Sequence, residues 1–268
     1  MASAGPEVIK AINAAAIALA MLGCCGGGQL VEPPDGPRSA AELIAKVVRP
    51  QTTTLQGTGR LVAYTDGERR SATVLVVAAR PKSMQIQALT PTLDLIAVVS
   101  SDGERFLSYE RGSDKCWVGK ACPRNLARIL PLPLPSEGLV AALLGDLPLL
   151  PAPVDQQRLS WDGEKSLYRL QLGAVTALHQ QVFVQPKDWR IVGAIWFFGD
   201  QRLASLHYDG ELTPLGPPRI ISVKTVTPKA DLTLELRDVQ LGAPVDPAVF
   251  AVACPDGTVQ AELPCEDK

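Results

Sequence analysis

The chain has 268 residues, of which 46% are hydrophobic and 20% are charged, and its formal net charge is −2. This length suits one globular domain of roughly 200–230 residues with a tail. No long run of either charge occurs, which argues against binding to nucleic acid or to an anionic membrane surface by charge alone.

The start of the chain has the pattern of an export signal. Residues 11–22 form an apolar segment that is shorter than a membrane-spanning helix requires. The following Gly23-Cys24 resembles the end of a bacterial lipobox, in which the cysteine becomes the first mature residue and carries the lipid. We therefore predict a lipoprotein signal peptide over residues 1–23 and lipid attachment at Cys24. An ordinary signal peptide cut nearby is the alternative.

A tether and a short helix follow. Residues 24–39 are rich in glycine and proline, which predicts a flexible linker. Ser39 and Glu42 have the spacing of a capping box, and apolar residues recur through Val48, so a short amphipathic helix is expected before Pro50. The folded domain is predicted over residues 40–268.

Two series of strands make up most of this domain. Alternating apolar residues, separated by turn sequences such as Asp102-Gly103, predict short antiparallel strands. The first series is expected at residues 54–64, 71–79, 83–89, 94–100 and 105–110. The second series is expected at residues 158–161, 166–172, 180–185, 190–198, 202–208, 219–227 and 232–241. About a dozen strands without βαβ alternation indicate an all-β sandwich or barrel with helical decoration.

A helical segment separates the two series. Leu139, Leu143 and Leu147 recur at a spacing of four, Ser136 is a plausible N-cap, and Gly145 suits the helix end. The helix carries almost no charge, so it should lie against apolar surface. Two interpretations stay open: a packed core helix, and a plug or lid over an apolar cavity.

The cysteines agree with an exported protein. Cys116 and Cys122 lie close in sequence, as do Cys254 and Cys265, which predicts the disulfides Cys116–Cys122 and Cys254–Cys265 in an oxidising compartment. A zinc site is disfavoured because the two histidines are isolated and no CxxC occurs.

The sequence holds none of the common catalytic patterns. GxSxG, HExxH and the phosphate loop are all missing, so neither an enzyme nor a cofactor is expected. The densest aromatic run is Trp196-Phe197-Phe198. It belongs either to the core or to the wall of an apolar ligand site.

Several motifs together resemble the bacterial lipoprotein-carrier superfamily that includes LolA and LolB. They are Gln56-Gly57-Thr58-Gly59 in the first strand, residues 86–93 with their Pro-Thr-Leu loop, residues 132–148 around the helix, and residues 250–257 near the end. This resemblance implies an incomplete, curved antiparallel β-barrel of about 11–12 strands with a helical lid, whose concave apolar face holds acyl chains. It also implies that Leu93, at the position of LolB's exposed loop leucine, inserts into the membrane. An ordinary core position is the alternative for Leu93.

The candidate cavity lining combines this expectation with the strand pattern. It consists of apolar residues from both strand series and the helix: Leu61, Met84, Ile86, Leu95, Leu143, Leu147, Ile195, Trp196 and Phe198.

Two functions remain in competition. The first is a lipid-anchored, periplasm-facing protein, at the outer membrane, that binds acyl chains of lipids or lipoproteins. The second is an envelope scaffold with a packed interior that binds a protein partner. An open apolar cavity of a few hundred Å³ would favour the first, and a filled interior the second.

Overall fold

A computed structural model describes residues 31–65, 67–128, 132, 134–214, 216–251 and 253–265. The predicted signal peptide, Cys24 and the first part of the tether lie outside these residues. In the described chain, one sheet contains fourteen strands. The first group is β1 (Thr54–Thr65), β2 (Glu68–Ala79), β3 (Ser83–Leu89), β4 (Leu95–Ser101), β5 (Arg105–Glu110) and β6 (Lys115–Lys120). The second is β7 (Gln157–Asp162), β8 (Leu167–Leu172), β9 (Leu178–Val184), β10 (Ile191–Phe198), β11 (Gln201–Asp209), β12 (Ile220–Thr225) and β13 (Ala230–Leu241), followed by β14 (Val259–Leu263).

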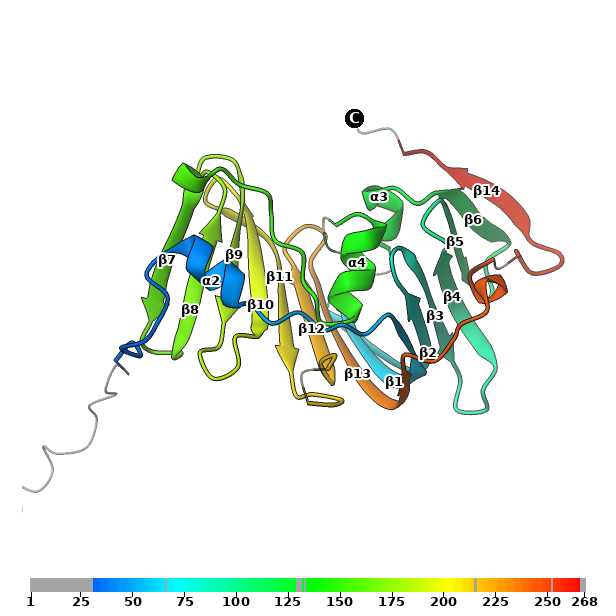
Figure 1. The fold of residues 1–268 in the computed structure, drawn as a ribbon. Coiled ribbons are helices and arrows are strands. Elements are labelled where there is room, and N and C mark those ends of the chain that lie inside the picture. Colours follow the sequence, from blue (N-terminus) through cyan, green and yellow to red (C-terminus); the bar gives the residue numbers. More distant parts are fainter. Residues whose placement is uncertain are drawn as a thin grey trace, which may run out of the picture.

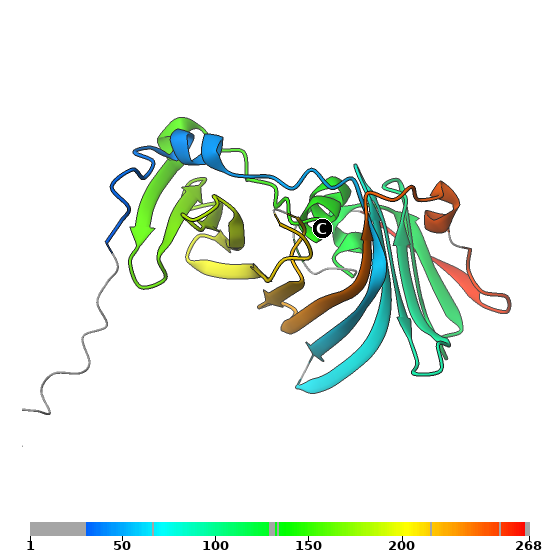
Figure 2. The same ribbon diagram turned by 60° about the horizontal axis from the view of Figure 1, so that its bottom comes forward.

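Each strand group is an antiparallel meander, and the two meanders join through β1 and β13. Strand β14 adds to β6 in parallel, so β14 and β7 are the two edges. The sheet curves strongly without closing, with helices on its inner side (Figures 1 and 2). This is the incomplete β-barrel with a helical lid that the sequence predicted.

The helices lie where the chain must cross the sheet. Strand β6 is near one edge and β7 is at the other, so the connection between them, described at residues 121–128, 132 and 134–156, runs across the inner side. This crossing segment contains α3 (Pro123–Leu126), α4 (Ser136–Leu143) and the 3-10 helix η1 (Val154–Gln156). The earlier helix α2 (Ala40–Lys46) packs near β7 (Figure 1). Its predicted cap is confirmed, because the Ser39 side chain accepts from the Glu42 amide.

Helix α4 fills the inner side of the curve. Leu139, Val140 and Leu144 have no exposed surface, and the helix packs against β2 and β3. Its end is as predicted, with Gly145 at φ +78°, a backbone conformation in which a Cβ would be strained. Its start is not: Pro135 holds the N-cap position, and Ser136 is a buried first-turn residue without a capping bond. The helix is therefore packed into the core.

The outer face of the first meander is covered by the C-terminal segment. The 3-10 helix η2 (Pro247–Phe250) lies there, and the Gln85 and Ser100 side chains donate to the Val249 and Phe250 carbonyl oxygens at 2.5 and 2.9 Å. These bonds satisfy two polar side chains that are otherwise buried.

All four predicted cysteines form disulfides, but the predicted pairing is wrong. The bonds are Cys116–Cys254 and Cys122–Cys265, with Cα–Cα distances of 5.8 and 6.0 Å. Strand β6 extends between Cys116 and Cys122 and separates them by on the order of 20 Å, too far for a bridge. Because β14 runs parallel to β6, Cys254 and Cys265 come to lie beside opposite ends of that strand.

Candidate functional site

A groove of about 560 Å³ runs along the outward side of α4. Ligand pockets typically measure about 300–1,000 Å³, so this volume suits a small apolar molecule or an acyl chain. The groove is lined by α4, by residues 146–151 that follow it, which we call the strap, by the turn after β2, and by β9 and β10. The lining residues are Arg49, Arg80, Pro81, Leu134, Pro135, Glu137, Gly138, Ala141, Asp146, Pro148, Leu149, Leu150, Pro151, Leu178 and Trp196.

Small side chains on α4 create the space. Gly138 and Ala141 face the groove, and a Cβ at Gly138 would lie 3.2 Å from the Leu134 Cβ and 3.4 Å from the Pro148 Cγ. Trp196 of β10, which is 2% exposed, and Leu178 of β9, which is 40% exposed, add apolar side chains to the lining. The groove therefore has an apolar end at the second strand meander.

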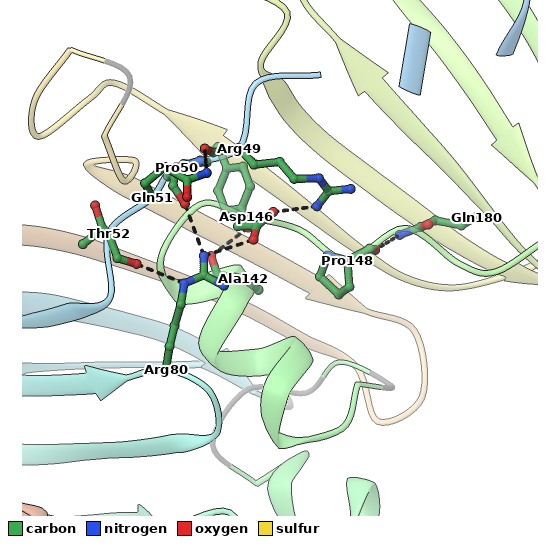
Figure 3. Close-up of polar contacts among 10 residues, drawn as sticks. Arg49, Pro50, Gln51, Thr52, Arg80, Ala142, Asp146, Pro148 and Gln180 are labelled. Carbon is green, nitrogen blue, oxygen red and sulfur yellow. Dashed lines mark hydrogen bonds and ion pairs between the residues drawn. The ribbon is translucent and has the colours of Figure 1, made fainter. Parts of the chain in front are cut away.

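The other end of the groove is polar and centred on Asp146 (Figure 3). Its carboxylate accepts from the Arg49 guanidinium at 2.6 Å and from the Arg80 guanidinium at 3.0 Å. Arg80 also donates to the Thr52 carbonyl at 3.0 Å. The Asp146 side chain is 16% exposed, so its carboxylate is largely shielded from water, whereas Arg80 and Arg49 are 29% and 39% exposed.

Gln180 holds the strap from the opposite side. It is fully buried on β9, where its Nε2 donates to the Pro148 carbonyl at 3.2 Å (Figure 3). Its Oε1 accepts from the Leu150 amide at 2.8 Å. A buried amide with both functions satisfied fixes the position of the backbone it contacts. The strap residues Leu149 and Leu150 are thereby held over the groove.

Tyr208 of β11 secures α4 itself. Its hydroxyl donates to the Ala142 carbonyl at 2.7 Å in a fully buried setting. Burial, and then the nearby Asp146 carboxylate, raise the pKa of Tyr208 above its ordinary value, so the phenol stays protonated and keeps donating.

The nine predicted lining residues separate into two groups. Six belong to the main core, namely Leu61, Met84, Ile86, Leu143, Leu147 and Trp196. Of these, Trp196 lines the groove; Met84, Leu143 and Leu147 are buried in the packing around α4.

The remaining three lie elsewhere. Leu95 packs in a separate cluster with Val98 and Leu107, under the C-terminal segment, so its prediction was wrong. The prediction for Ile195 was also wrong. Ile195 lies between the inward-facing Ala194 and Trp196 and therefore faces the opposite side of β10. Phe198 lies at the strand end and is 60% exposed.

Leu93 lies at the surface, not in the core. It is 71% exposed and has φ +65°, a left-handed conformation that is uncommon for leucine. The loop is held by backbone bonds from Thr90 to Asp94 and from Leu93 to Thr90, both 2.9 Å. Its insertion into a membrane stays a prediction.

Sequence reasoning did not find the polar residues of the groove. Gln180 left a signal, since it interrupts the inward apolar positions Val182 and Val184 of β9. Arg49, Arg80 and Asp146 come from distant segments, and no local pattern marks them.

Neither a metal site nor a membrane-spanning helix is found among the residues that the structure describes. Among them, His, Cys, Asp and Glu side chains do not gather in groups of three that could hold a metal ion. In the same part of the chain, no helix has the length and apolar character needed to cross a membrane.

Comparison with known proteins gives structural likeness without sequence likeness. No family model matches the sequence, and no curated protein matches it. A DUF1329 family protein from Desulfovibrio piger is similar in structure, with a TM-score of 0.51, 11% identity, and 79% of this chain and 93% of that chain covered.

Two other solved structures are similar at a lower score. One is a LolA superfamily protein from Nitrosomonas europaea, with a TM-score of 0.49, 12% identity, and 80% and 98% coverage. The other is a domain described as outer membrane lipoprotein-sorting from Vibrio parahaemolyticus, with a TM-score of 0.49, 10% identity, and 79% and 94% coverage.

The curved, unclosed sheet with helices on its inner side is the incomplete β-barrel that the resemblance to LolA and LolB implied, and the Desulfovibrio piger protein has a similar fold. At these identities the likeness concerns the fold alone.

Proposed function

We propose that this protein is a lipid-anchored, periplasm-facing protein of the cell envelope, at the outer membrane, that binds acyl chains of lipids or lipoproteins for their transport. It works without a catalytic group. Lipid at Cys24 holds the domain to the membrane through the tether. The Leu93 loop contributes a contact with the membrane.

The groove beside α4 is the observation that carries this proposal. It combines an apolar end at Leu178 and Trp196 with a polar end at Asp146, which suits an amphiphile. Each acyl CH₂ that leaves water contributes about 0.8 kcal/mol. Binding therefore requires only a shaped apolar surface, and transfer requires only a next site of higher affinity.

The filled inner side of the sheet determines where an acyl chain can bind. Helix α4 occupies the space that a fully open half-barrel would offer to a ligand. We therefore assign the acyl chain to the groove and not to the centre of the barrel.

The same filled interior favours a second candidate function. A packed half-barrel suits an envelope scaffold that binds a protein partner through its surface. This alternative predicts no uptake of an acyl probe.

Titration with a fluorescent fatty-acyl probe separates the two functions. Ala141→Phe adds a ring to α4 on the groove side, and we expect it to weaken probe binding by at least about tenfold, because the ring fills the space. Ala45→Phe is the matched control, since Ala45 is an exposed helical alanine on α2. If wild type takes up no probe, or if both variants bind like wild type, the groove is not the acyl site.

A further inference from the structure

Four exposed apolar residues gather at one corner of the second strand meander. They are Val154 (81% exposed), Val175 (54%), Leu178 and Phe198, and we call this group the apolar corner. They come from η1, the turn between β8 and β9, and the facing ends of β9 and β10. The end of the sheet where β7 begins lies at the upper left of Figure 1.

Backbone contacts join these segments into one surface. Leu178 and Phe198 are direct partners across β9 and β10, so their side chains lie on the same face. The Gly199 amide donates to the Ala177 carbonyl at 3.1 Å, and the Gly173 amide donates to the Gln156 carbonyl at 3.1 Å. The turn between β8 and β9 is thus a neighbour of both η1 and the turn between β10 and β11.

The apolar corner continues the groove to the outside. Leu178 belongs to both, and Trp196 at the groove wall lies two residues before Phe198 on β10. An acyl chain that leaves the apolar end of the groove therefore meets Leu178 and then Phe198.

Charge at the corner is balanced. The turn of residues 173–177 has the sequence Gly-Ala-Val-Thr-Ala, without a charged side chain. The exposed charged residues beside it are two acidic and two basic ones: Asp155, Arg158, Asp200 and Arg202. Side chains that protrude from turns with no net charge suit the uncharged interface of a bilayer better than a basic or acidic partner.

We propose that the apolar corner docks on a zwitterionic lipid bilayer and opens the groove toward it. This inference rests on the proposed acyl-binding function and adds the place of exchange. It differs from the Leu93 loop, which lies in the other meander and offers a single leucine beside Thr90, Thr92 and Asp94.

A polarity-sensitive dye placed at the corner tests this inference. In the full chain with Cys24→Ser and Cys25→Ser, the remaining four cysteines are in disulfides, so a nitrobenzoxadiazole dye will label one introduced thiol. We expect the dye at Val175→Cys to gain emission several-fold and shift to the blue with phosphatidylcholine vesicles. Spin-labelled lipid in the vesicles should quench it.

Val226→Cys is the matched control, because Val226 is an exposed valine in the turn between β12 and β13. The dye there should keep its emission in water, and Leu93→Cys tests the rival surface. Unchanged emission at Val175→Cys, or an equal rise at Val226→Cys, would overturn the docking proposal.

A second variant separates this result from the acyl-binding function. Val175→Asp should abolish co-sedimentation with phosphatidylcholine vesicles while acyl-probe uptake in solution stays as in wild type, because Val175 does not line the groove. If probe uptake is normal but the dye at position 175 stays in water, the groove binds acyl chains and the docking proposal alone is overturned. If wild type takes up no probe, the proposed acyl-binding function of the groove is rejected, whatever the dye at the corner shows.

Discussion

The two strand meanders differ in how their faces are covered. The first, β1 to β6 with β14, is covered on its inner face by α4 and on its outer face by the C-terminal segment, and it holds both disulfides. The second, β7 to β13, carries the apolar end of the groove and the exposed residues of the apolar corner. This contrast assigns stability to the first meander and, under the proposed function, the binding surface to the second.

The crossing segment is attached to the two meanders by different chemistry. On the side of the first meander, Asp146 pairs with Arg80, a charged contact that salt weakens. On the side of the second meander, the neutral side chains of Gln180 and Tyr208 hold the backbone. Three variants, in order of decreasing expected effect, test these differences: the first concerns the stability of the first meander, and the other two concern the two attachments of the crossing segment.

Removing a disulfide should have the largest effect. Cys116→Ala with Cys254→Ala opens a cross-link between residues 138 apart in sequence, and we expect the free energy of unfolding to fall by about 4–5 kcal/mol on the loop-entropy account. Urea denaturation followed by tryptophan fluorescence measures it, with reduced wild type as the control. Acyl-probe binding under native conditions should stay, since the groove lies outside this region. Alkylation of all four cysteines in the unreduced protein would contradict the assigned bridges.

Asp146→Asn should have an intermediate effect. It leaves the Arg49 and Arg80 guanidinium groups without their shared carboxylate, and we expect a loss of about 1–2 kcal/mol, between the values of exposed and buried ion pairs. The loss should shrink in high salt. Glu104→Gln is the matched control, because its ion pair with Lys82 is largely exposed and its loss should stay within about 0.5 kcal/mol. Equal losses in both variants would show that shielding at Asp146 is unimportant.

Tyr208→Phe should have the smallest effect of the three. The variant keeps the ring and removes one hydrogen bond to the Ala142 carbonyl, which costs about 1 kcal/mol. Unlike that of Asp146→Asn, this loss should not depend on salt. Thermal unfolding in low and high salt tests both statements, and a salt-dependent loss at Tyr208 would remove the proposed contrast between the two attachments.

Much of the fold could be predicted because the strands alternate clearly between apolar and polar residues. Eleven pairs of adjacent strands in the sheet are consecutive in sequence and can be predicted as hairpins. The central helix can be predicted from its leucine spacing. Strands β6 and β14 were missed because both carry weak alternation of apolar and polar residues. Because β14 was not predicted, the sequence favoured disulfides between cysteines that are close in sequence. The actual partner of Cys116 is Cys254, 138 residues away.

The site was harder to predict than the fold. Which face of β10 points inward depends on register, and a shift of one residue exchanges Ile195 for Trp196. The space itself results from small residues on α4 against a strap held by Gln180, and these contacts form only in the folded chain. The corner was visible in sequence only as the uncharged turn before Leu178.

The pairing of β1 with β13 has a consequence for biosynthesis. Leu55 pairs with Leu241, so one side of β1 lacks its partner until nearly the whole chain has been made. During that time the nascent first meander presents an unpaired strand edge, which can recruit strands from other chains. Such late closure makes folding slow and gives a holding chaperone a defined segment to shield, the free edge of β1.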